Sequence, residues 1–193
     1  MAKVRFRIAM SLDGYTEDAQ GRFGWGVPGD DEVLSYINEL GASIRTYLYG
    51  GRMYETMVYW ETAPMTPDVP EPERNYTLQW QSAEKVVYSR TLAEPRSKRT
   101  RIEREFDPSA IQRLKAESAG DLSVDGPGLA AQALAAGLVD EIYPIVCPVV
   151  VGGGKRFFPD GVALNLDLLE ARSFKSGVMI LRYAVRHDVP GKE

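Results

Sequence analysis

Strand-like and helix-like segments alternate along this chain of 193 residues, and that alternation limits its fold more than any other feature. Short runs rich in β-branched and aromatic residues predict strands, whereas apolar residues three and four positions apart predict helices. Val33, Ile37 and Leu40 have this helical spacing in the segment from Asp30 to Leu40. Strands separated by helices indicate βαβ units and therefore a largely parallel sheet.

The chain shows no low-complexity linker and no internal repeat, so we expect one domain over residues 1–193. Near its end, residues 168–174 and 178–185 predict an antiparallel hairpin joined around Lys175, Ser176 and Gly177. Such a hairpin adds antiparallel edge strands and makes the sheet mixed. The other predicted strands are residues 4–10, 46–49, 85–88, 121–124 and 141–151, and the predicted helices are residues 30–40, 52–60, 71–82, 128–136 and one that begins at Asp107 and Pro108.

Composition narrows the class of protein. A hydrophobic fraction of 44% and a charged fraction of 26% are typical of a globular chain with a sizeable core. The net charge of −4 gives no general attraction to nucleic acid or to anionic membranes. Cys147 is the only cysteine and His187 the only histidine, so we expect neither a disulfide framework nor a Cys/His metal site. Together these features predict a soluble, cytoplasmic protein.

A basic run over residues 96–101 suggests contact with nucleic acid. The run contains no aromatic residue, however, and Glu103 and Glu105 follow it closely. We therefore favour a solvated hairpin at this position and expect no nucleic-acid partner.

Five loops that follow predicted strands carry glycine, hydroxyl or basic residues. In a parallel sheet such loops meet at the carboxyl ends of the strands, where ligands bind. Glycines that lead into a helix expose backbone N–H groups to an anion, and a basic side chain adds a charged contact. Each loop taken alone also fits an ordinary turn or helix cap, so the residues by themselves leave both interpretations open. The loops are residues 9–14, 48–55, 86–91, 124–130 and 148–158.

Taken together and in order, these loops resemble the dihydrofolate reductase superfamily, especially the reductase domain of the bifunctional riboflavin-biosynthesis protein and its stand-alone relatives. The most specific matches are Ser11-Leu12-Asp13-Gly14 and the run from Asp140-Glu141-Ile142 through Pro148 to Gly152-Gly153-Gly154-Lys155-Arg156-Phe157-Phe158. The resemblance implies a three-layer α/β fold, in which a mixed, mostly parallel sheet has helices on both faces and an antiparallel C-terminal hairpin. It also implies NADPH as the cofactor, with NADH less favoured.

The resemblance also assigns residues to the cofactor. Ala9 matches the position whose backbone holds the nicotinamide carboxamide, and Asp13 and Gly14 match the start of the loop over the nicotinamide. Ser89 and Arg90 match the region of the adenosine 2′-phosphate. The pyrophosphate-binding turn matches Gly50, Gly51, Arg52 and Met53, and the second glycine turn matches Gly126, Pro127, Gly128, Leu129 and Ala130.

This chain departs from its relatives at Gly51, where they usually have an arginine. One phosphate ligand is therefore missing, and Arg90 would compensate because a single arginine can grip a phosphate with two hydrogen bonds. In dihydrofolate reductases the second glycine turn contains a cis Gly-Gly bond. Proline tolerates the cis form at a cost of only about 0.5–1 kcal/mol, so we predict a cis bond between Gly126 and Pro127.

The segment from Trp25 to Asp30 matches the tryptophan-to-acid spacing that carries the proton donor in dihydrofolate reductases. We therefore predict that Asp30 is the catalytic acid and that Trp25 and Asp30 contact the substrate. An aspartate in front of a helix is also what capping favours, and Asp31 is the nearest competitor for the catalytic role. Lys155 and Arg156 are the candidates for binding a phosphate on the substrate.

The implied reaction is hydride transfer from NADPH to the carbon of a C=N group in a pyrimidine- or pterin-type substrate. It is most similar to that of 5-amino-6-(5-phosphoribosylamino)uracil reductase in riboflavin biosynthesis, with dihydrofolate reductase activity as an alternative. An alternative of another class, an NADPH-binding regulatory or resistance module without turnover, stays open because of Gly51. Relatives are often homodimers, and the resemblance implies the same here, with residues 141–151 as a candidate interface.

Overall fold

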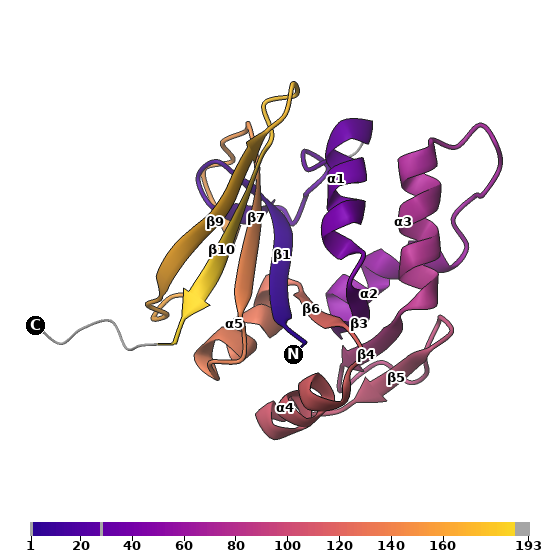
Figure 1. The fold of residues 1–193 in the computed structure, drawn as a ribbon, viewed down its shortest axis with the longest axis vertical. Helices are drawn as coiled ribbons and strands as arrows, with labels where there is room; N and C mark the ends of the chain where they lie inside the picture. The colour runs from indigo at the N-terminus through magenta and orange to yellow at the C-terminus, as the bar shows by residue number, and fades with distance from the viewer. Residues whose placement is uncertain (1, 28, 188–193) are drawn as a thin grey trace, which may run out of the picture.

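The computed structural model describes residues 2–27 and 29–187, and Figure 1 shows how they are arranged. Strand and helix alternate over most of the chain, as predicted. The strands are β1 (Val4–Ser11), β2 (Tyr15–Asp18), β3 (Ile44–Gly50), β4 (Glu84–Tyr88), β5 (Thr100–Glu103), β6 (Asp121–Asp125), β7 (Glu141–Cys147), β8 (Gly154–Arg156), β9 (Asn165–Ser173) and β10 (Met179–Arg186). The helices are α1 (Asp31–Gly41), α2 (Gly51–Met57), α3 (Glu71–Ser82), α4 (Pro108–Glu117) and α5 (Pro127–Ala135), with a 3₁₀ turn, η1, over Val58–Glu61.

Eight of these strands form one sheet in the order β5-β4-β3-β6-β1-β7-β10-β9. Neighbouring strands from β5 to β7 run parallel, whereas β10 pairs antiparallel with both β7 and β9. β2 and β8 form a separate antiparallel ribbon. The predicted mixed, mostly parallel sheet that ends in an antiparallel hairpin is confirmed.

Helices cover both faces of the sheet, which confirms the three-layer prediction (Figure 1). α1, α2 and α3 pack on one face, and α4 and α5 pack on the other. α1 and α4 begin at the aspartates that the sequence indicated. Asp30 Oδ1 accepts a hydrogen bond from Val33 N at 3.0 Å, and Asp107 Oδ1 accepts one from Ser109 N at 2.9 Å. These caps satisfy N–H groups that have no partner within the helix.

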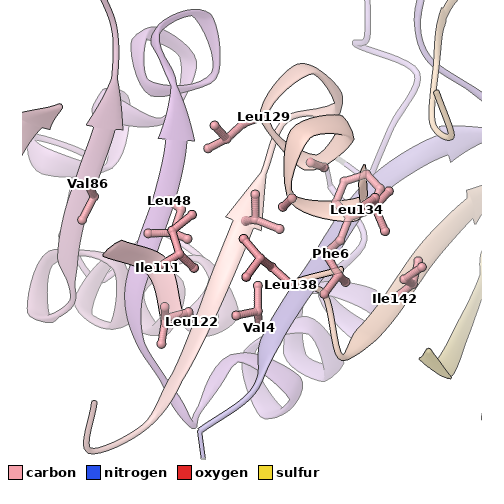
Figure 2. Close-up of a cluster of buried hydrophobic side chains, with 14 of the residues drawn as sticks. Val4, Phe6, Leu48, Val86, Ile111, Leu122, Leu129, Leu134, Leu138 and Ile142 are labelled. Carbon is pink, nitrogen blue, oxygen red and sulfur yellow. The ribbon is translucent and has the colours of Figure 1, made fainter. Parts of the chain in front are cut away.

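The two faces of the sheet differ in chemistry. Beneath α4 and α5 the core is almost entirely aliphatic (Figure 2). On the opposite face, alternate residues of the same strands are aromatic or polar, because successive side chains of a strand point to opposite faces. Tyr47 and Tyr49 of β3 stack there with ring centroids 5.6 Å apart, and Trp80 Nε1 donates to Tyr49 OH at 2.9 Å. The face under α1 to α3 is therefore the one that offers hydroxyls and charges.

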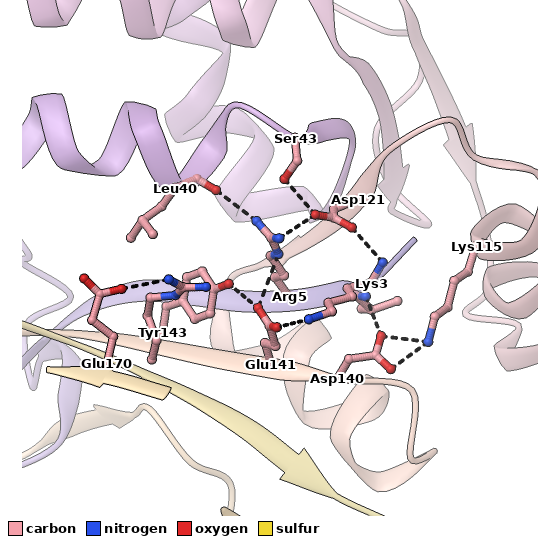
Figure 3. A network of polar contacts seen from close by, with 12 residues as sticks. Lys3, Arg5, Leu40, Ser43, Lys115, Asp121, Asp140, Glu141, Tyr143 and Glu170 are labelled. Carbon is pink, nitrogen blue, oxygen red and sulfur yellow. Dashed lines mark hydrogen bonds and ion pairs between the residues drawn. The ribbon is translucent and has the colours of Figure 1, made fainter. Parts of the chain in front are cut away.

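A network of ion pairs connects the amino-terminal ends of β1, β6 and β7 (Figure 3). Arg5 lies 2.5 Å from Asp121 and 3.6 Å from Glu141, and it also donates to Leu40 O at 2.9 Å. Lys3 forms a further pair with Glu141. These charges satisfy one another at the end of the sheet opposite to the glycine turns. Their arrangement therefore indicates a role in stability.

Two predictions about strands are corrected by the structure, and two short strands, β2 and β8, were not predicted. The strand predicted over residues 141–151 ends at Cys147, because Val149 N donates to Cys147 O at 2.8 Å in a tight turn around Pro148. The basic run does not form a hairpin, since its end begins β5, which pairs parallel with β4. β2 and β8 are additional strands of only four and three residues, too short to give a clear alternation in the sequence.

The predicted cis bond between Gly126 and Pro127 is wrong, because the described residues contain no cis peptide. Gly126 instead has a φ of 94°, a conformation that glycine adopts without steric cost. Pro127 then occupies the first turn of α5, where its fixed φ suits a helix and its missing N–H leaves no donor unpaired. The positive φ of glycine therefore makes the turn that we attributed to a cis bond.

Candidate functional site

A cavity of about 930 Å³ opens at the carboxyl ends of the central strands, on the face covered by α1 to α3. Ala9 of β1, Gly50 of β3 and Asp125 of β6 mark these strand ends in its lining. The volume is at the upper end of the roughly 300–1,000 Å³ that is usual for small-molecule sites. The cavity has two parts, which we call the cofactor half and the substrate half.

The cofactor half lies between the two glycine turns, residues 50–53 and 126–129. A Cβ added to Gly50 would meet no atom within 4 Å, and one added to Gly128 would meet only Lys155 Nζ, at 3.8 Å. The backbone at both turns is therefore open to close approach by a ligand. Arg52 stands beside the first turn, with its guanidinium 3.2 Å from the Glu17 carboxylate.

These features fit a dinucleotide. A pyrophosphate between the turns would meet backbone N–H groups on both sides and the cationic side chains of Arg52 and Lys155. Within residues 2–27 and 29–187, no three or more His, Cys, Asp or Glu side chains are grouped as metal ligands. The same part of the chain contains no helix that is long and apolar enough to cross a membrane.

The structure brings most of the predicted cofactor residues together in this cavity. Those that line it come from the end of β1 and from both glycine turns. They are Ala9, Gly50, Gly51, Arg52, Met53, Gly126, Pro127, Gly128 and Leu129. The predicted residues outside the lining are Asp13, Gly14, Ser89, Arg90 and Ala130, and the last of these is buried in the aliphatic core.

Asp13 and Gly14 hold the neighbouring loop. The Asp13 carboxylate accepts hydrogen bonds from Val151 N at 3.2 Å and Gly152 N at 2.7 Å. A hydrogen bond from Ser11, together with these two, keeps the pKa of Asp13 below its ordinary value. Gly14 O accepts from Phe157 N at 2.9 Å. These contacts fix the course of the chain into and out of β8, the strand that carries Lys155.

Ser89 and Gly51 form a tightly packed corner. A Cβ on Gly51 would lie 3.1 Å from Ser89 Oγ, so this hydroxyl fills the space in which a side chain at position 51 would begin. Ser89 Oγ also accepts a hydrogen bond from Leu92 N at 3.1 Å. Arg90 is exposed and lies 3.7 Å from Glu105. Its predicted contact with a 2′-phosphate stays a prediction.

Asp30 caps α1 and lies outside the cavity lining, although Trp25 is part of that lining. Hydrogen bonds from Ser176 and from the backbone of Val33 lower the pKa of Asp30. A carboxylate held ionised in this way is poorly suited to donate a proton. Pro28, which belongs to the same motif, lies outside the described residues. The catalytic role of Asp30 thus stays a prediction without support from its position.

A different carboxyl group, that of Asp125, lies inside the cavity. Its side chain is 7% exposed and accepts a hydrogen bond from Ser123 Oγ at 2.7 Å. Burial raises its pKa to about 6, although the charge of Arg7 and the bond from Ser123 act in the opposite direction. In the sequence, Asp125 stands out only as part of the glycine-containing loop over residues 124–130. Its position on the polar face of β6, two residues after Ser123, is the signal that could have identified it.

Arg7 of β1 lies beside Asp125, because the register of β1 with β6 pairs Phe6 with Val124 and the next residues follow on the polar face. Arg7 is 8% exposed, and its guanidinium donates to Ile37 O and to Tyr47 OH, both at 3.3 Å. Burial raises the pKa of Tyr47 and of Tyr76. Both tyrosines therefore stay protonated near neutral pH, which leaves Asp125 as the group of this cluster that can change its charge.

The substrate half is bounded by α1, η1, α3 and the loop before α1, and its walls are mostly apolar. Trp60 and Tyr76 pack edge to face, with ring centroids 4.7 Å apart. Trp25 Nε1 is buried without a hydrogen-bond partner among the described residues. The lining residues of this half are Phe23, Trp25, Val27, Leu34, Ile37, Met57, Trp60, Glu73 and Tyr76, with Arg7, Asp125 and Ile145 at its base.

The two cations predicted to bind a substrate phosphate lie elsewhere. Lys155 is on the cofactor half, as its distance to Gly128 shows. Arg156, the next residue of β8, lies outside the lining, 3.9 Å from Asp160 and over the ring of Tyr15. Alternation of side chains along a strand explains why only one of these neighbours reaches the cavity.

Comparison with known proteins identifies the family of this chain. The family described as "RibD C-terminal domain" matches residues 2–180. The chain belongs to this family. A relative in Bacillus subtilis (strain 168), "Uncharacterized protein YyaP", is 29% identical over 184 residues and covers 94% of each chain. The family contains riboflavin-biosynthesis reductase domains, so membership supports an oxidoreductase-like protein.

Solved structures show the same fold for this RibD C-terminal domain protein. A putative riboflavin biosynthesis protein from Shewanella sp. PV-4 superposes with a TM-score of 0.75 at 21% identity, over 96% of this chain and 99% of its own. The diaminohydroxyphosphoribosylaminopyrimidine deaminase/5-amino-6-(5-phosphoribosylamino)uracil reductase of Thermotoga maritima gives a TM-score of 0.66 at 13% identity. The match covers 96% of this chain and 57% of the Thermotoga protein.

Proposed function

We propose that this protein is an NADPH-dependent reductase that transfers a hydride to the carbon of a C=N group in a pyrimidine- or pterin-type substrate. One observation carries this proposal: a single cavity joins two open glycine turns to a buried carboxyl group with a pKa near 6. Membership in the RibD C-terminal domain family supports the reaction class.

When bound, NADPH supplies the hydride, and the chain supplies binding, orientation and a proton. The glycine turns and the side chains of Arg52 and Lys155 would hold its pyrophosphate. The backbone at Ala9, near the end of β1, would bind the nicotinamide. Met57, Trp60 and Tyr76 exclude water from the reacting atoms, which favours transfer over side reactions.

Asp125 is the proton donor in this proposal. Its carboxyl group is partly protonated near neutral pH because burial raises its pKa to about 6. Its O–H donates the proton to the nitrogen of the C=N group, so the product gains one hydrogen on carbon and one on nitrogen. Arg7 then faces the carboxylate that remains, which limits the cost of leaving that charge buried. A general acid with a pKa near the working pH is the efficient choice.

The first experiment compares thermal unfolding with NADPH and with NADH. A ligand at 100 times its Kd stabilises the folded state by about 2.7 kcal/mol, which raises Tm by roughly 5–11 °C for a chain of this size. Arg52→Ala and Lys155→Ala should each reduce the rise with NADPH. Arg156→Ala is the matched control, since Arg156 lies outside the cavity, and it should leave the rise unchanged. Absence of stabilisation by either nucleotide would refute the proposal.

A further inference from the structure

We infer that the substrate reduced in this site is a flat heteroaromatic ring that carries no phosphate group. This inference rests on the proposed function and narrows its substrate class. A phosphate carries about two negative charges near neutral pH, and a buried charge needs partners of opposite sign. A phosphate on the substrate would therefore need cationic side chains in the substrate half.

The cavity lining contains three cationic side chains, and two of them belong to the cofactor half. Lys155 Nζ stands over Gly128, and Arg52 stands at the start of α2 beside Glu17. Both side chains would therefore be taken up by the pyrophosphate of a bound dinucleotide. Arg156, the remaining cation that the sequence offered for a substrate phosphate, points out of the cavity toward Asp160.

The third cation, Arg7, is not free to bind a phosphate. It is buried, it already donates to Ile37 O and Tyr47 OH, and it lies beside Asp125. Glu73 adds a second carboxylate to the lining of the same half. A phosphate at Arg7 would therefore share the site with two acidic groups, and like charges at close range disfavour each other.

The walls instead suit a planar, uncharged ring. Trp60 and Tyr76, fixed edge to face, offer aromatic surfaces against which such a ring can pack. Leu34 and Ile37 of α1 contribute further apolar surface to the cavity. Polar groups also face the edge of such a ring. Trp25 Nε1 has no hydrogen-bond partner among the described residues and can donate to a carbonyl oxygen, and the Asp125 carboxyl group can bind a ring N–H or nitrogen.

The test is a set of binding measurements on the complete chain saturated with NADP⁺, so that no turnover occurs. Quenching of tryptophan fluorescence and isothermal titration calorimetry are recorded with three probes: lumazine, 1,3-dimethyllumazine and 5-amino-6-(5-phosphoribosylamino)uracil. Lumazine is a bare pteridine ring with an amide edge, its dimethyl derivative has that edge blocked, and the third probe carries a phosphate.

We expect lumazine to bind with a Kd about 100-fold or more below that of the phosphorylated probe, because an unpaired buried charge is costly. Blocking the amide edge should weaken binding by about tenfold, the effect of one lost hydrogen bond in a buried site. Equal or tighter binding of the phosphorylated probe, or no binding of lumazine, would overturn the inference. If NADP⁺ itself does not bind, the proposed function fails first, and the two failures are thus distinguishable.

Two neighbouring aromatic residues provide a matched pair of variants. Trp60→Ala removes a wall of the substrate half and should weaken lumazine about tenfold or more, in line with the loss of one stacking partner. Tyr59→Ala removes the adjacent ring, which is 51% exposed and outside the lining, and should leave the Kd unchanged. Equal effects of the two substitutions would contradict binding in this half.

Discussion

Replacing the Asp125 carboxyl group by an amide should stabilise the protein and inactivate it. Burial raises the pKa of Asp125 from 3.8 to about 6, so the folded chain favours the neutral acid. Between these pH values the folded state binds more protons than the unfolded state, and the free energy of unfolding therefore falls as pH rises through this window. Asp125→Asn removes that loss because an amide does not ionise.

The magnitude follows from the difference between the two pKa values. One pH unit corresponds to about 1.36 kcal/mol, so the raised pKa of Asp125 lowers stability by about 3 kcal/mol at pH 7.5 and by about 1 kcal/mol at pH 4.5. Asp125→Asn should thus gain about 3 kcal/mol at pH 7.5, or roughly 6–12 °C in Tm. The amide oxygen can still accept the hydrogen bond from Ser123.

Urea unfolding of both proteins at several pH values between 4.5 and 7.5 measures this difference. The same variant should lose about 10²–10⁴-fold in kcat, the usual contribution of a general acid, while its affinity for NADPH stays the same. If Asp125→Asn is less stable than the parent chain at pH 7.5, or if the gap does not narrow toward pH 4.5, the assignment of a buried acid with a raised pKa is refuted.

Glu141→Gln is a control because the pKa shift of Glu141, and with it the expected change in stability, has the opposite sign. Burial acts to raise the pKa of Glu141, but hydrogen bonds from Lys3 and Tyr143 and the charges of Lys3 and Arg5 outweigh it and lower the pKa. The stability that Glu141 contributes is therefore present near neutral pH and is lost as pH falls. The variant should be less stable by about 3 kcal/mol at pH 7.5, with a gap that narrows on acidification and no change in kcat. If the difference in stability between this variant and the parent chain widened on acidification, the lowered pKa of Glu141 would be contradicted.

Substitutions at three further positions test other parts of the site. Asp30→Asn should keep both the α1 cap and full turnover, whereas Asp30→Ala should cost about 1 kcal/mol of stability; a large loss of kcat in Asp30→Asn would return the catalytic role to this residue. Gly154→Ala should destabilise by about 1–3 kcal/mol and weaken NADPH binding, because its Cβ would lie 2.0 Å from Glu17 O and displace the strand that carries Lys155. Arg90→Ala should reduce the preference for NADPH over NADH if Arg90 binds the 2′-phosphate, and an unchanged preference measured by thermal shift would remove it from that role.

Local signals in the sequence were sufficient for most of the fold. Asp30 and Asp107 identified the starts of α1 and α4, since a capping aspartate acts on N–H groups only two or three residues away. The glycine turns at Gly50 and Gly126 likewise identified the strand ends that meet in the cavity. Each of these features depends on neighbours close in sequence, and a pattern can therefore show them.

Features that depend on distant residues could not be read in this way. β8 exists because Gly154 allows its backbone to approach β2, more than 130 positions earlier in the chain. Asp125 has a raised pKa because the packing of β6 against β1 and β3 buries it, whereas in the sequence it is simply an aspartate before a glycine. In the sequence, Lys155 and Arg156 are equivalent candidates. The pairing of β8 directs Lys155 into the cavity and Arg156 away from it.

β1 and β6 each carry two charged residues on the same face, and the two arginine–aspartate pairs that result differ in their surroundings. β1 presents Arg5 and Arg7 on one face, and β6 presents Asp121 and Asp125 on the same face. At the amino-terminal end, Arg5 and Asp121 lie 2.5 Å apart and satisfy each other. At the carboxyl end, Arg7 and Asp125 are both described but form no ion pair, and Arg7 bonds instead to Ile37 and Tyr47. The paired acid stabilises the fold. The incompletely compensated one has its pKa raised to about 6, at a cost in stability, and in the function that we propose this raised pKa lets Asp125 donate a proton to the acceptor nitrogen.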